Sequence, residues 1–200
     1  MNKSIYAKSF IAILEREIIK LFNQKGRLLS SLIRPSLWLF IFAAGFGNIF
    51  GVSIIPPYET YITYQVYVLP GLIGIILLYN GMQSSLSMVY DREMGMMRLL
   101  LVSPIPRWYM LFSKIISSTI LSIIQVYVFL LLCIIFKISL PISGLIYILP
   151  FLIMSGFMLG SLALLITVYI KQLENFAGIM NFVIFPMFFF IYFFVPGVEN

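Results

Sequence analysis

Long apolar runs separated by short polar breaks occupy most of this sequence from residue 35 onward. About 20 mostly apolar residues in a helix are enough to cross a hydrocarbon layer roughly 30 Å thick. The breaks contain proline, glycine or charged residues, which end helices or favour reversals of the chain. We therefore expect an all-α, polytopic membrane protein with a single transmembrane domain over residues 1–200. The five predicted transmembrane helices cover residues 35–55, 66–89, 108–136, 144–170 and 176–195.

The segment before the first run, residues 1–33, follows a different pattern. Between residues 5 and 23 apolar side chains recur every three or four positions, and basic residues such as Lys8 and Lys20 fall on the opposite face. This spacing predicts an amphipathic helix that lies in the membrane interface and contacts lipid. Glu17 falls on the apolar face, where it either snorkels or pairs with a nearby basic residue, or else contacts a partner protein.

The positions of the lysines and arginines indicate the orientation. Twelve of the 13 lie in the N-terminal segment, within residues 92–114, or at Lys171, and only Lys137 lies in the opposite connections. Cytoplasmic loops carry such an excess of basic residues, so we place these segments in the cytoplasm. The same distribution accounts for the net charge of +6 without a nucleic-acid partner. The N-terminus lacks the pattern of a cleavable signal peptide, so we expect it to be retained.

The composition disfavours several classes of chemistry. Hydrophobic residues make up 62% of the chain and charged residues 10%, and the mean hydropathy is +1.06. There is no histidine and only one cysteine, Cys133, so metal sites and imidazole catalysis lack their commonest groups. No G-x-x-x-x-G-K-[ST] phosphate loop is present, so the chain has no ATP site of its own. We expect no catalytic, metal or cofactor site, and the predicted helices contain no deep acidic residue for proton-driven transport.

The connection over residues 90–107 is longer, and richer in charged and apolar residues, than a simple turn between two helices requires. It opens with Asp91, Arg92 and Glu93, continues with methionines and leucines, and closes at Ser103 and Pro104. This arrangement predicts a short amphipathic helix across the membrane surface. Its apolar side chains would be buried either against lipid headgroups or against a partner protein.

A set of short motifs, taken in order along the chain, resembles the type-2 ABC permeases over roughly residues 16–183. Within that family the sequence looks most like permeases associated with quinoprotein alcohol-oxidation systems, and more distantly like drug and lipo-oligosaccharide exporters. The motifs are Arg16-Glu17-Ile18, Arg27-Leu28-Leu29, Arg34-Pro35-Ser36-Leu37-Trp38-Leu39-Phe40, Leu69-Pro70-Gly71, Asn80-Gly81, and Asp91-Arg92-Glu93-x-Gly95 followed by Leu99 and Ser103-Pro104.

This resemblance implies the permease subunit of an ATP-driven exporter in the bacterial inner membrane. A separate ABC ATPase subunit would bind the ATP, and a second permease copy or homologue would complete a dimer. Arg16 and Glu17 would belong to a cytoplasmic connecting helix. The connection over residues 90–107 would be the coupling helix that docks on the ATPase, through Asp91, Arg92, Glu93, Gly95, Arg98 and Pro104.

Two alternatives to an active exporter remain at the level of sequence. Members of the family usually have six transmembrane helices, whereas five are predicted here, so the chain could be a truncated, inactive permease. An integral-membrane enzyme acting on lipid-linked substrates is the other alternative. Such an enzyme would need clustered acids or histidines at the membrane face.

Polar residues within the predicted helices form two stripes at helical spacing. They either hydrogen-bond between helices or line the export path. Two glycine pairs at GxxxG spacing, Gly47 with Gly51 and Gly156 with Gly160, are interpreted as close-packing positions. The stripes comprise Asn80, Gln83, Ser84 and Ser87 in the second predicted helix, and Ser118, Ser122 and Gln125 in the third.

Overall fold

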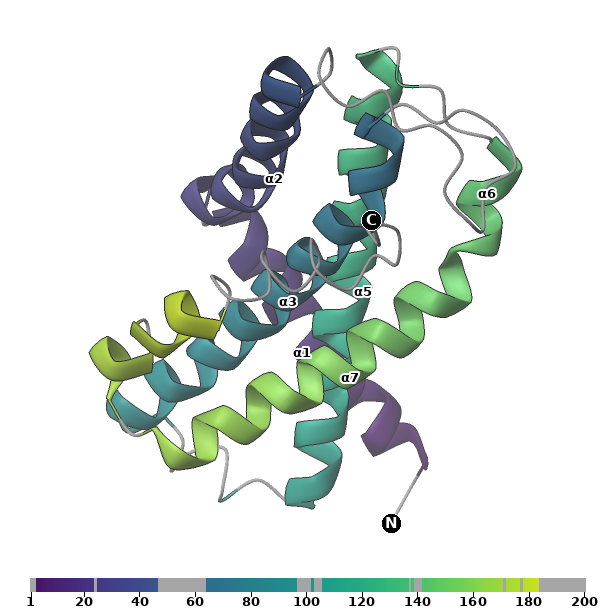
Figure 1. Ribbon diagram of the computed structural model, residues 1–200. Coiled ribbons are helices and arrows are strands. Elements are labelled where there is room, and N and C mark those ends of the chain that lie inside the picture. The colour runs from purple at the N-terminus through teal and green to yellow at the C-terminus, as the bar shows by residue number, and fades with distance from the viewer. Residues whose placement is uncertain are drawn as a thin grey trace.

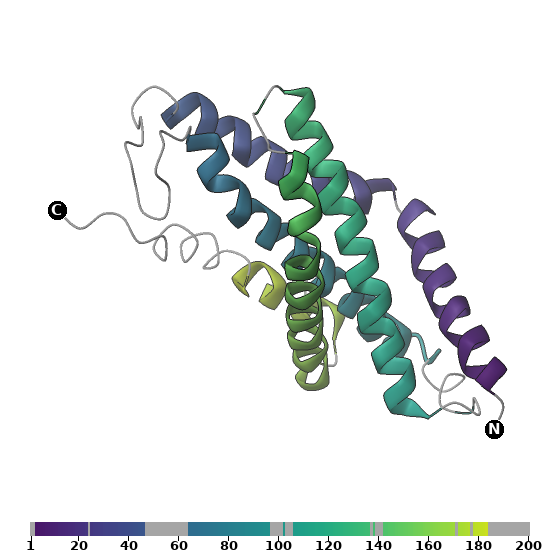
Figure 2. The same cartoon turned by 90° about the vertical axis from the view of Figure 1, so that its right-hand side faces the viewer.

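A computed structural model describes residues 3–23, 25–46, 64–96, 102, 106–136, 138, 142–170, 172–176 and 178–183. These residues form an all-helical bundle without strands (Figures 1 and 2). Two short helical segments, 173–176 and 178–183, follow the last long helix. The main helices are α1 (Lys3–Asn23), α2 (Lys25–Phe46), α3 (Tyr64–Glu93), α5 (Arg107–Ile135), α6 (Ile142–Tyr147) and α7 (Leu149–Tyr169).

Three described helices are long and apolar enough to cross a membrane: Val68–Glu93, Arg107–Ile135 and Gly144–Tyr169. They overlap the predicted helices over residues 66–89, 108–136 and 144–170, so the all-α, polytopic class is confirmed. Of the first predicted span, residues 47–55 lie outside the described residues, as do residues 184–195 of the fifth. The total number of spans therefore stays a prediction.

Helix α3 lies at the centre of the bundle and packs against α2, α5 and α7 (Figure 1). Its residues Leu72, Ile76, Met82 and Val89 are at most 1% exposed. A helix that carries apolar or small residues on every side is buried on every side. The packing around α3 therefore holds the described helices together.

Helices α5 and α7 form the outer surface. Leu131 and Ile135 of α5 and Met154 and Val168 of α7 are all more than half exposed. In a polytopic membrane protein such faces contact lipid tails, which are as apolar as the side chains themselves. Van der Waals contact between closely approaching backbones must then supply much of the attraction between helices.

Helix α1 corresponds to the predicted amphipathic helix. It packs beside α5 at the edge of the bundle (Figure 2). The rings of Tyr6 and Tyr109 meet edge to face with their centroids 5.0 Å apart. The Tyr109 hydroxyl also donates a 2.8 Å hydrogen bond to the carbonyl of Tyr6. Part of α1 is therefore buried against protein, and its depth in the membrane interface stays a prediction.

Small residues allow α3, α5 and α7 to approach one another closely. A Cβ atom added to Gly81 of α3 would lie 3.4 Å from the Cα of Gly160 in α7. One added to Gly156 of α7 would lie 2.7 Å from the Cγ2 of Thr119 in α5. The interpretation of Gly156 and Gly160 as close-packing positions is confirmed, whereas Gly47 and Gly51 lie outside the described residues.

Replacing Gly156 with alanine should destabilise the bundle by about 1–3 kcal/mol, because the new methyl group overlaps Thr119 in an already close-packed site. The free energy of unfolding in mixed micelles, measured by titration with a denaturing detergent, tests this expectation. Adding Thr119→Ser removes the overlapping methyl group and should restore most of the loss.

Gly74→Ala is the matched control, because no atom lies within 4 Å of a Cβ built at Gly74. Alanine also favours the helix over glycine, so this variant should be as stable as the wild type or slightly more so. Equal destabilisation by the alanines at positions 74 and 156 would contradict the close-packing role of Gly156.

Candidate functional site

Four helices are tied together by polar contacts at one end of the bundle. The C-terminal ends of α3 and α7 meet there with the N-terminal part of α5 and with α1. The sequence predicted that the N-terminal segment, the connection after residue 89 and the end of the fourth run share one side of the membrane. Ion pairs and a hydrogen bond between α1, α3, α5 and α7 hold these segments together.

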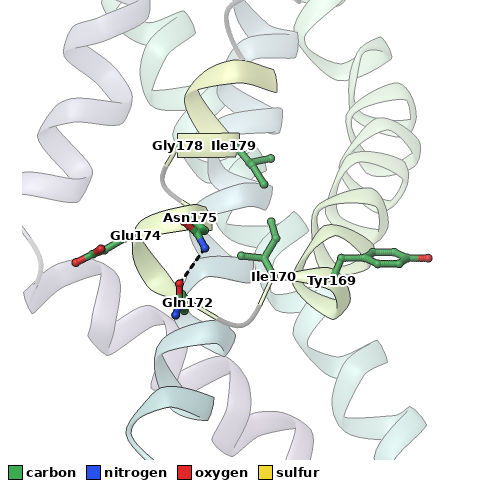
Figure 3. Close-up of a pocket in the computed structure, with 7 residues that line it drawn as sticks. All are labelled: Tyr169, Ile170, Gln172, Glu174, Asn175, Gly178 and Ile179. Atoms are coloured by element: carbon green, nitrogen blue, oxygen red, sulfur yellow. Dashed lines mark hydrogen bonds between the residues drawn. The ribbon is translucent and has the colours of Figure 1, made fainter.

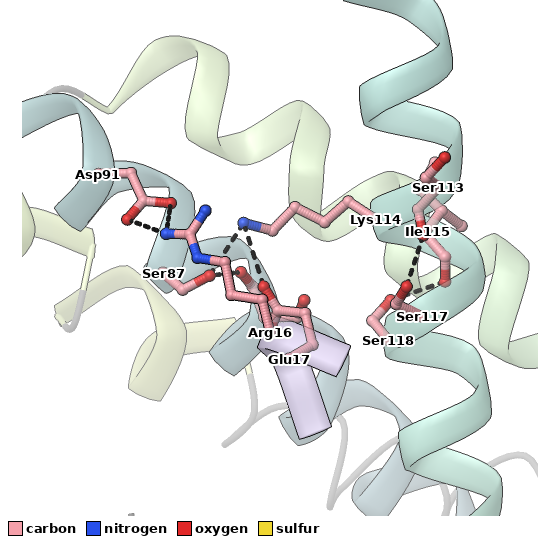
Figure 4. Close-up of polar contacts among 10 residues, drawn as sticks. Arg16, Glu17, Ser87, Asp91, Ser113, Lys114, Ile115, Ser117 and Ser118 are labelled. Carbon is pink, nitrogen blue, oxygen red and sulfur yellow. Dashed lines mark hydrogen bonds and ion pairs between the residues drawn. The ribbon is translucent and has the colours of Figure 1, made fainter. Parts of the chain in front are cut away.

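An ion pair connects α1 to α3 across 75 positions of sequence (Figure 4). The Nη2 atom of Arg16 donates to both carboxylate oxygens of Asp91 at 2.7 Å. The Asp91 side chain is 5% exposed and the Arg16 side chain 38% exposed. Solvent screening at Arg16 limits the stabilisation, but the buried Asp91 carboxylate would be costly without a paired cation.

A second ion pair lies beside the first and joins α1 to α5. The Nζ atom of Lys114 lies 3.8 Å from Oε1 of Glu17, whose side chain is only 3% exposed. The same ammonium group donates a 2.9 Å hydrogen bond to the Ser87 hydroxyl of α3 (Figure 4). Glu17 therefore pairs with a basic residue, one of its two predicted roles, but that residue is distant in sequence. Lys114 joins three helices.

Arg92 links α3 to α7 through a hydrogen bond. Its Nη1 atom donates a 3.1 Å hydrogen bond to the carbonyl of Thr167, in the last turn of α7. Such a carbonyl has no partner within its own helix, and the negative end of the helix dipole favours a cation there. Arg92 thus satisfies an unpaired group at the end of α7.

Helix α3 ends in a turn whose backbone conformation depends on Gly95. The amides of Met94 and Gly95 donate to the carbonyls of Tyr90 and Arg92, at 3.0 and 3.2 Å. The φ angle of Gly95 is 73°, in the left-handed region that strains any residue with a side chain. We call residues 93–96 the exposed turn, because all four are exposed.

The predicted coupling residues therefore divide into two groups. Asp91 and Arg92 form contacts within the chain, and Glu93 and Gly95 lie in the exposed turn. Arg98 and Pro104 lie outside the described residues. Helix α3 also continues past the predicted boundary at residue 89, so the charged opening of the connection is its last turn.

Sequence reasoning did not single out Lys114 as a site residue. It was counted only as one of the basic residues that set the orientation. Its position within the predicted helix 108–136 was the available signal, because a charged residue inside a membrane helix usually has a buried partner.

The polar stripes of the predicted helices face the interior of the bundle. Ser84, Ser118, Ser122, Asn80 and Gln125 are each at most 5% exposed. The hydroxyls of Ser118 and Ser122 donate to backbone carbonyls one turn earlier in α5, at 2.8 Å. Within the described residues, Asn80 Nδ2, Ser84 Oγ and both amide atoms of Gln125 have no hydrogen-bond partner.

A separate polar cluster joins α2 to the middle of α3. The guanidinium carbon of Arg34 lies 5.0 Å from the centroid of the Tyr79 ring. The Tyr79 hydroxyl shares a 3.2 Å hydrogen bond with Ser30 and accepts another, also 3.2 Å, from Nε2 of Gln83. We call Ser30, Arg34, Tyr79 and Gln83 the Tyr79 cluster.

A shallow cavity of about 630 Å³ lies beside the end of α7 and the short segments that follow it. Figure 3 shows that the side chains of Tyr169 and Glu174, both in its lining, point away from each other. Asn175 donates a 2.9 Å hydrogen bond to Gln172 across the exposed rim. The polar groups of this cavity do not converge on a common point, so it lacks the geometry of a binding site.

The helices and their paired charges define a polytopic membrane protein with a polar assembly of helix ends on one side. The family model described as the ABC-2 type transporter matches residues 8–197. The chain therefore belongs to the ABC-2 type transporter family. The predicted resemblance to type-2 ABC permeases is confirmed.

The curated relatives of this chain are named as transport permeases. The chain is 30% identical over 138 residues to a protein of Cyanophora paradoxa named "Putative transport permease ycf38", a match that covers 68% of this chain and 46% of the relative. It is 29% identical over 134 residues to the protein of the same name from Porphyra purpurea, covering 66% and 44%. The chain thus spans about half the length of these relatives. No solved structure matches it.

Arg16 and Asp91 should show mutual dependence in a double-mutant cycle. Asp91→Asn and Arg16→Gln should each destabilise the protein, and together they should cost less than their sum, by about 1 kcal/mol. Unfolding in mixed micelles measures the three free-energy differences. Glu15→Gln, at an exposed neighbour, should be additive with Asp91→Asn. Simple additivity of Arg16→Gln with Asp91→Asn would contradict an energetically coupled pair.

Proposed function

We propose that this chain is the membrane-spanning permease subunit of an ATP-driven exporter in the bacterial inner membrane. Residues 1–200 would act as one permease domain, with the energy supplied by a separate ABC ATPase subunit. Membership of the ABC-2 type family and the transport name of the curated relatives support this function. A second permease copy or a homologue would complete the pathway.

The observation that carries the proposal is the contrast within the last turn of α3. Asp91 and Arg92 are held by α1 and α7, whereas the next residues, 93–96, extend into solvent. Met94 is 60% exposed and Met96 49% exposed, beside the exposed carboxylate of Glu93. Flexible methionines next to a charge suit a docking surface that must fit a groove in another protein.

The fixed residues explain how movement of a docked ATPase would reach the helices. A force on the exposed turn would act directly on the end of α3. The Arg16–Asp91 pair would pass it to α1, and the Arg92 contact with the Thr167 carbonyl would pass it to α7. ATP would shift the conformational equilibrium through contacts that differ between the two states of this end of the bundle.

The first test is co-purification of an ATPase with the tagged chain from detergent-solubilised membranes of its own host. The wild type should recover a subunit that contains a phosphate loop and hydrolyses ATP. The double variant Glu93→Lys with Met94→Ser should lose at least about tenfold of this recovery, because it reverses the charge and removes the apolar contact of the exposed turn.

Glu174→Lys is the matched control, since it reverses an exposed acidic residue outside the exposed turn. It should recover the ATPase as the wild type does. Membrane insertion and yield should be the same for all three proteins. Full recovery with the Glu93 and Met94 double variant would contradict docking at the exposed turn, and recovery of no ATPase by the wild type would contradict the proposed exporter.

The orientation is tested by labelling introduced cysteines in intact cells. Cys133 is buried at 1% exposure, so the background reaction should be small. A cysteine at Met94, at the proposed cytoplasmic end, should react only with membrane-permeant reagents. A cysteine at Tyr147, which is 75% exposed at the opposite end, should also react with impermeant reagents. The reverse pattern would overturn the proposed sidedness.

A further inference from the structure

Two buried polar stripes meet between α3 and α5. The Lys114 ammonium of α5 donates to the Ser87 hydroxyl of α3, so the faces that carry these two residues contact each other. Residues three or four positions apart, and their multiples, share one face of a helix. We call the side chains that follow Ser87 and Lys114 on these two faces the polar seam, which consists of Asn80 and Ser84 in α3 and of Ser118, Ser122 and Gln125 in α5.

The polar seam has one charged end and one apolar end. From Lys114 to Gln125 it follows α5 for about 17 Å, at roughly 1.5 Å per residue. Directly after Gln125 the same helix enters an apolar cluster, in which Val126, Phe129 and Cys133 are each at most 1% exposed. The seam therefore begins at the ion-paired end of the bundle and stops at a closed apolar layer.

The groups of the polar seam are buried but only partly hydrogen-bonded. Ser118 and Ser122 donate to carbonyls of their own helix. Among the described residues, Asn80 Nδ2, Ser84 Oγ and both amide atoms of Gln125 have no hydrogen-bond partner. Unpaired polar groups removed from water are destabilising, whereas apolar groups of the same shape avoid this cost. The closed packing therefore gives no reason for an amide at position 125.

We propose that the polar seam opens to water from its charged end in a second conformation of the bundle, with Asn80, Ser84 and Gln125 as its lining. Water satisfies in that conformation the groups that have no partner in the closed one. The hydrogen bond between Lys114 and Ser87 breaks first, because it joins α3 to α5 at the charged end of the seam. The apolar cluster beyond Gln125 stays closed, so water enters from one side only.

This opening deepens the proposed exporter function but is measured without it. The exposed turn lies at the end of α3, so a force there moves Ser87 relative to Lys114. The open seam offers hydroxyl and amide groups to an uncharged polar part of a cargo, and this step alone rests on the proposed function. Hydration of the seam is measured on the chain by itself, without nucleotide or ATPase. Loss of ATPase docking would leave that measurement unchanged, so the two proposals fail separately.

Two cysteines on α5 compare the polar seam with the apolar cluster. Native Cys133 is 1% exposed in the cluster, and Ser122 is 2% exposed in the seam. Ser122→Cys combined with Cys133→Ala therefore moves the only thiol of the chain from one to the other. Each full-length protein is reconstituted into vesicles, with a membrane-impermeant cationic methanethiosulfonate on both sides.

Ser122→Cys should react at least about tenfold faster than Cys133, because only the seam opens to water while the two positions are equally buried in the closed bundle. Equal rates at the two positions would overturn the proposal. Reagent supplied only from the side that labels Met94→Cys should modify Ser122→Cys. Modification only from the side that labels Tyr147→Cys would contradict entry from the charged end.

Gln125→Met distinguishes an opening seam from a permanently closed one, because it removes both unpaired amide atoms and nearly conserves the volume. It should raise the midpoint of unfolding in a denaturing detergent. It should also slow the modification of Ser122→Cys by at least about fivefold, since the closed conformation gains stability and the open one loses a polar lining group. A lower midpoint, or an unchanged rate of modification, would overturn the proposal.

Gln83→Met is the matched control on α3. The Gln83 amide already donates to the Tyr79 hydroxyl and to the sulfur of Met180, so its removal takes away existing contacts. This variant should neither raise the midpoint of unfolding nor slow the modification of Ser122→Cys. The same gains from Gln83→Met as from Gln125→Met would contradict a specific role of the polar seam.

Discussion

Charges that leave water at the edge of a membrane must be paired, and this requirement organises the described bundle. Asp91 and Glu17 are nearly inaccessible, and an isolated carboxylate in such a place would be strongly destabilising. Their partners, Arg16 and Lys114, come from helices distant in sequence. The pairs therefore fix the position of α1 against the ends of α3 and α5. Apolar contacts alone would leave this position poorly specified, because lipid competes for apolar faces.

The same competition with lipid explains the interior around α3. Gly81, Gly156 and Gly160 bring backbones into contact, and the small side chains of Ser118 and Thr119 fill the space between them. The hydroxyls of Ser118, Thr119 and Ser122 in α5 are satisfied by the carbonyls of Ile115 and Ser118 in the same helix. Such residues give close packing without requiring a partner in another helix. The bundle thus combines specific ion pairs at one end with unspecific but dense packing in its middle.

The parts of the fold that depend on local sequence patterns could be predicted from the sequence. The apolar runs located α3, α5 and α7, and the positions of the basic residues grouped the helix ends that meet in the structure. The predicted span ends at residue 89 but α3 continues beyond it, because charged residues are compatible with a helix that leaves the membrane. The helix instead ends where Gly95 takes a positive φ angle.

The site was less predictable, because its contacts depend on the three-dimensional arrangement of helices. The resemblance assigned Asp91 and Arg92 to an interface with another protein, whereas both side chains are used within the chain. Nothing in the local sequence distinguishes Asp91 from Glu93, two positions later. Successive residues of a helix point in different directions, so only the placement of α1 and α7 decides which charge is buried and which is exposed.

Because acidic residues are scarce in this chain, buried cations have few carboxylates with which to pair. The chain has 7 acidic and 13 basic residues, so if each acid pairs with one cation, six cations are left without an acidic partner. Exposed cations near a membrane surface are satisfied by water and by anionic headgroups. Arg16 and Lys114 are partly buried and take the acids available at their end of the bundle. Arg34 is partly buried elsewhere, beside an aromatic ring instead of a carboxylate.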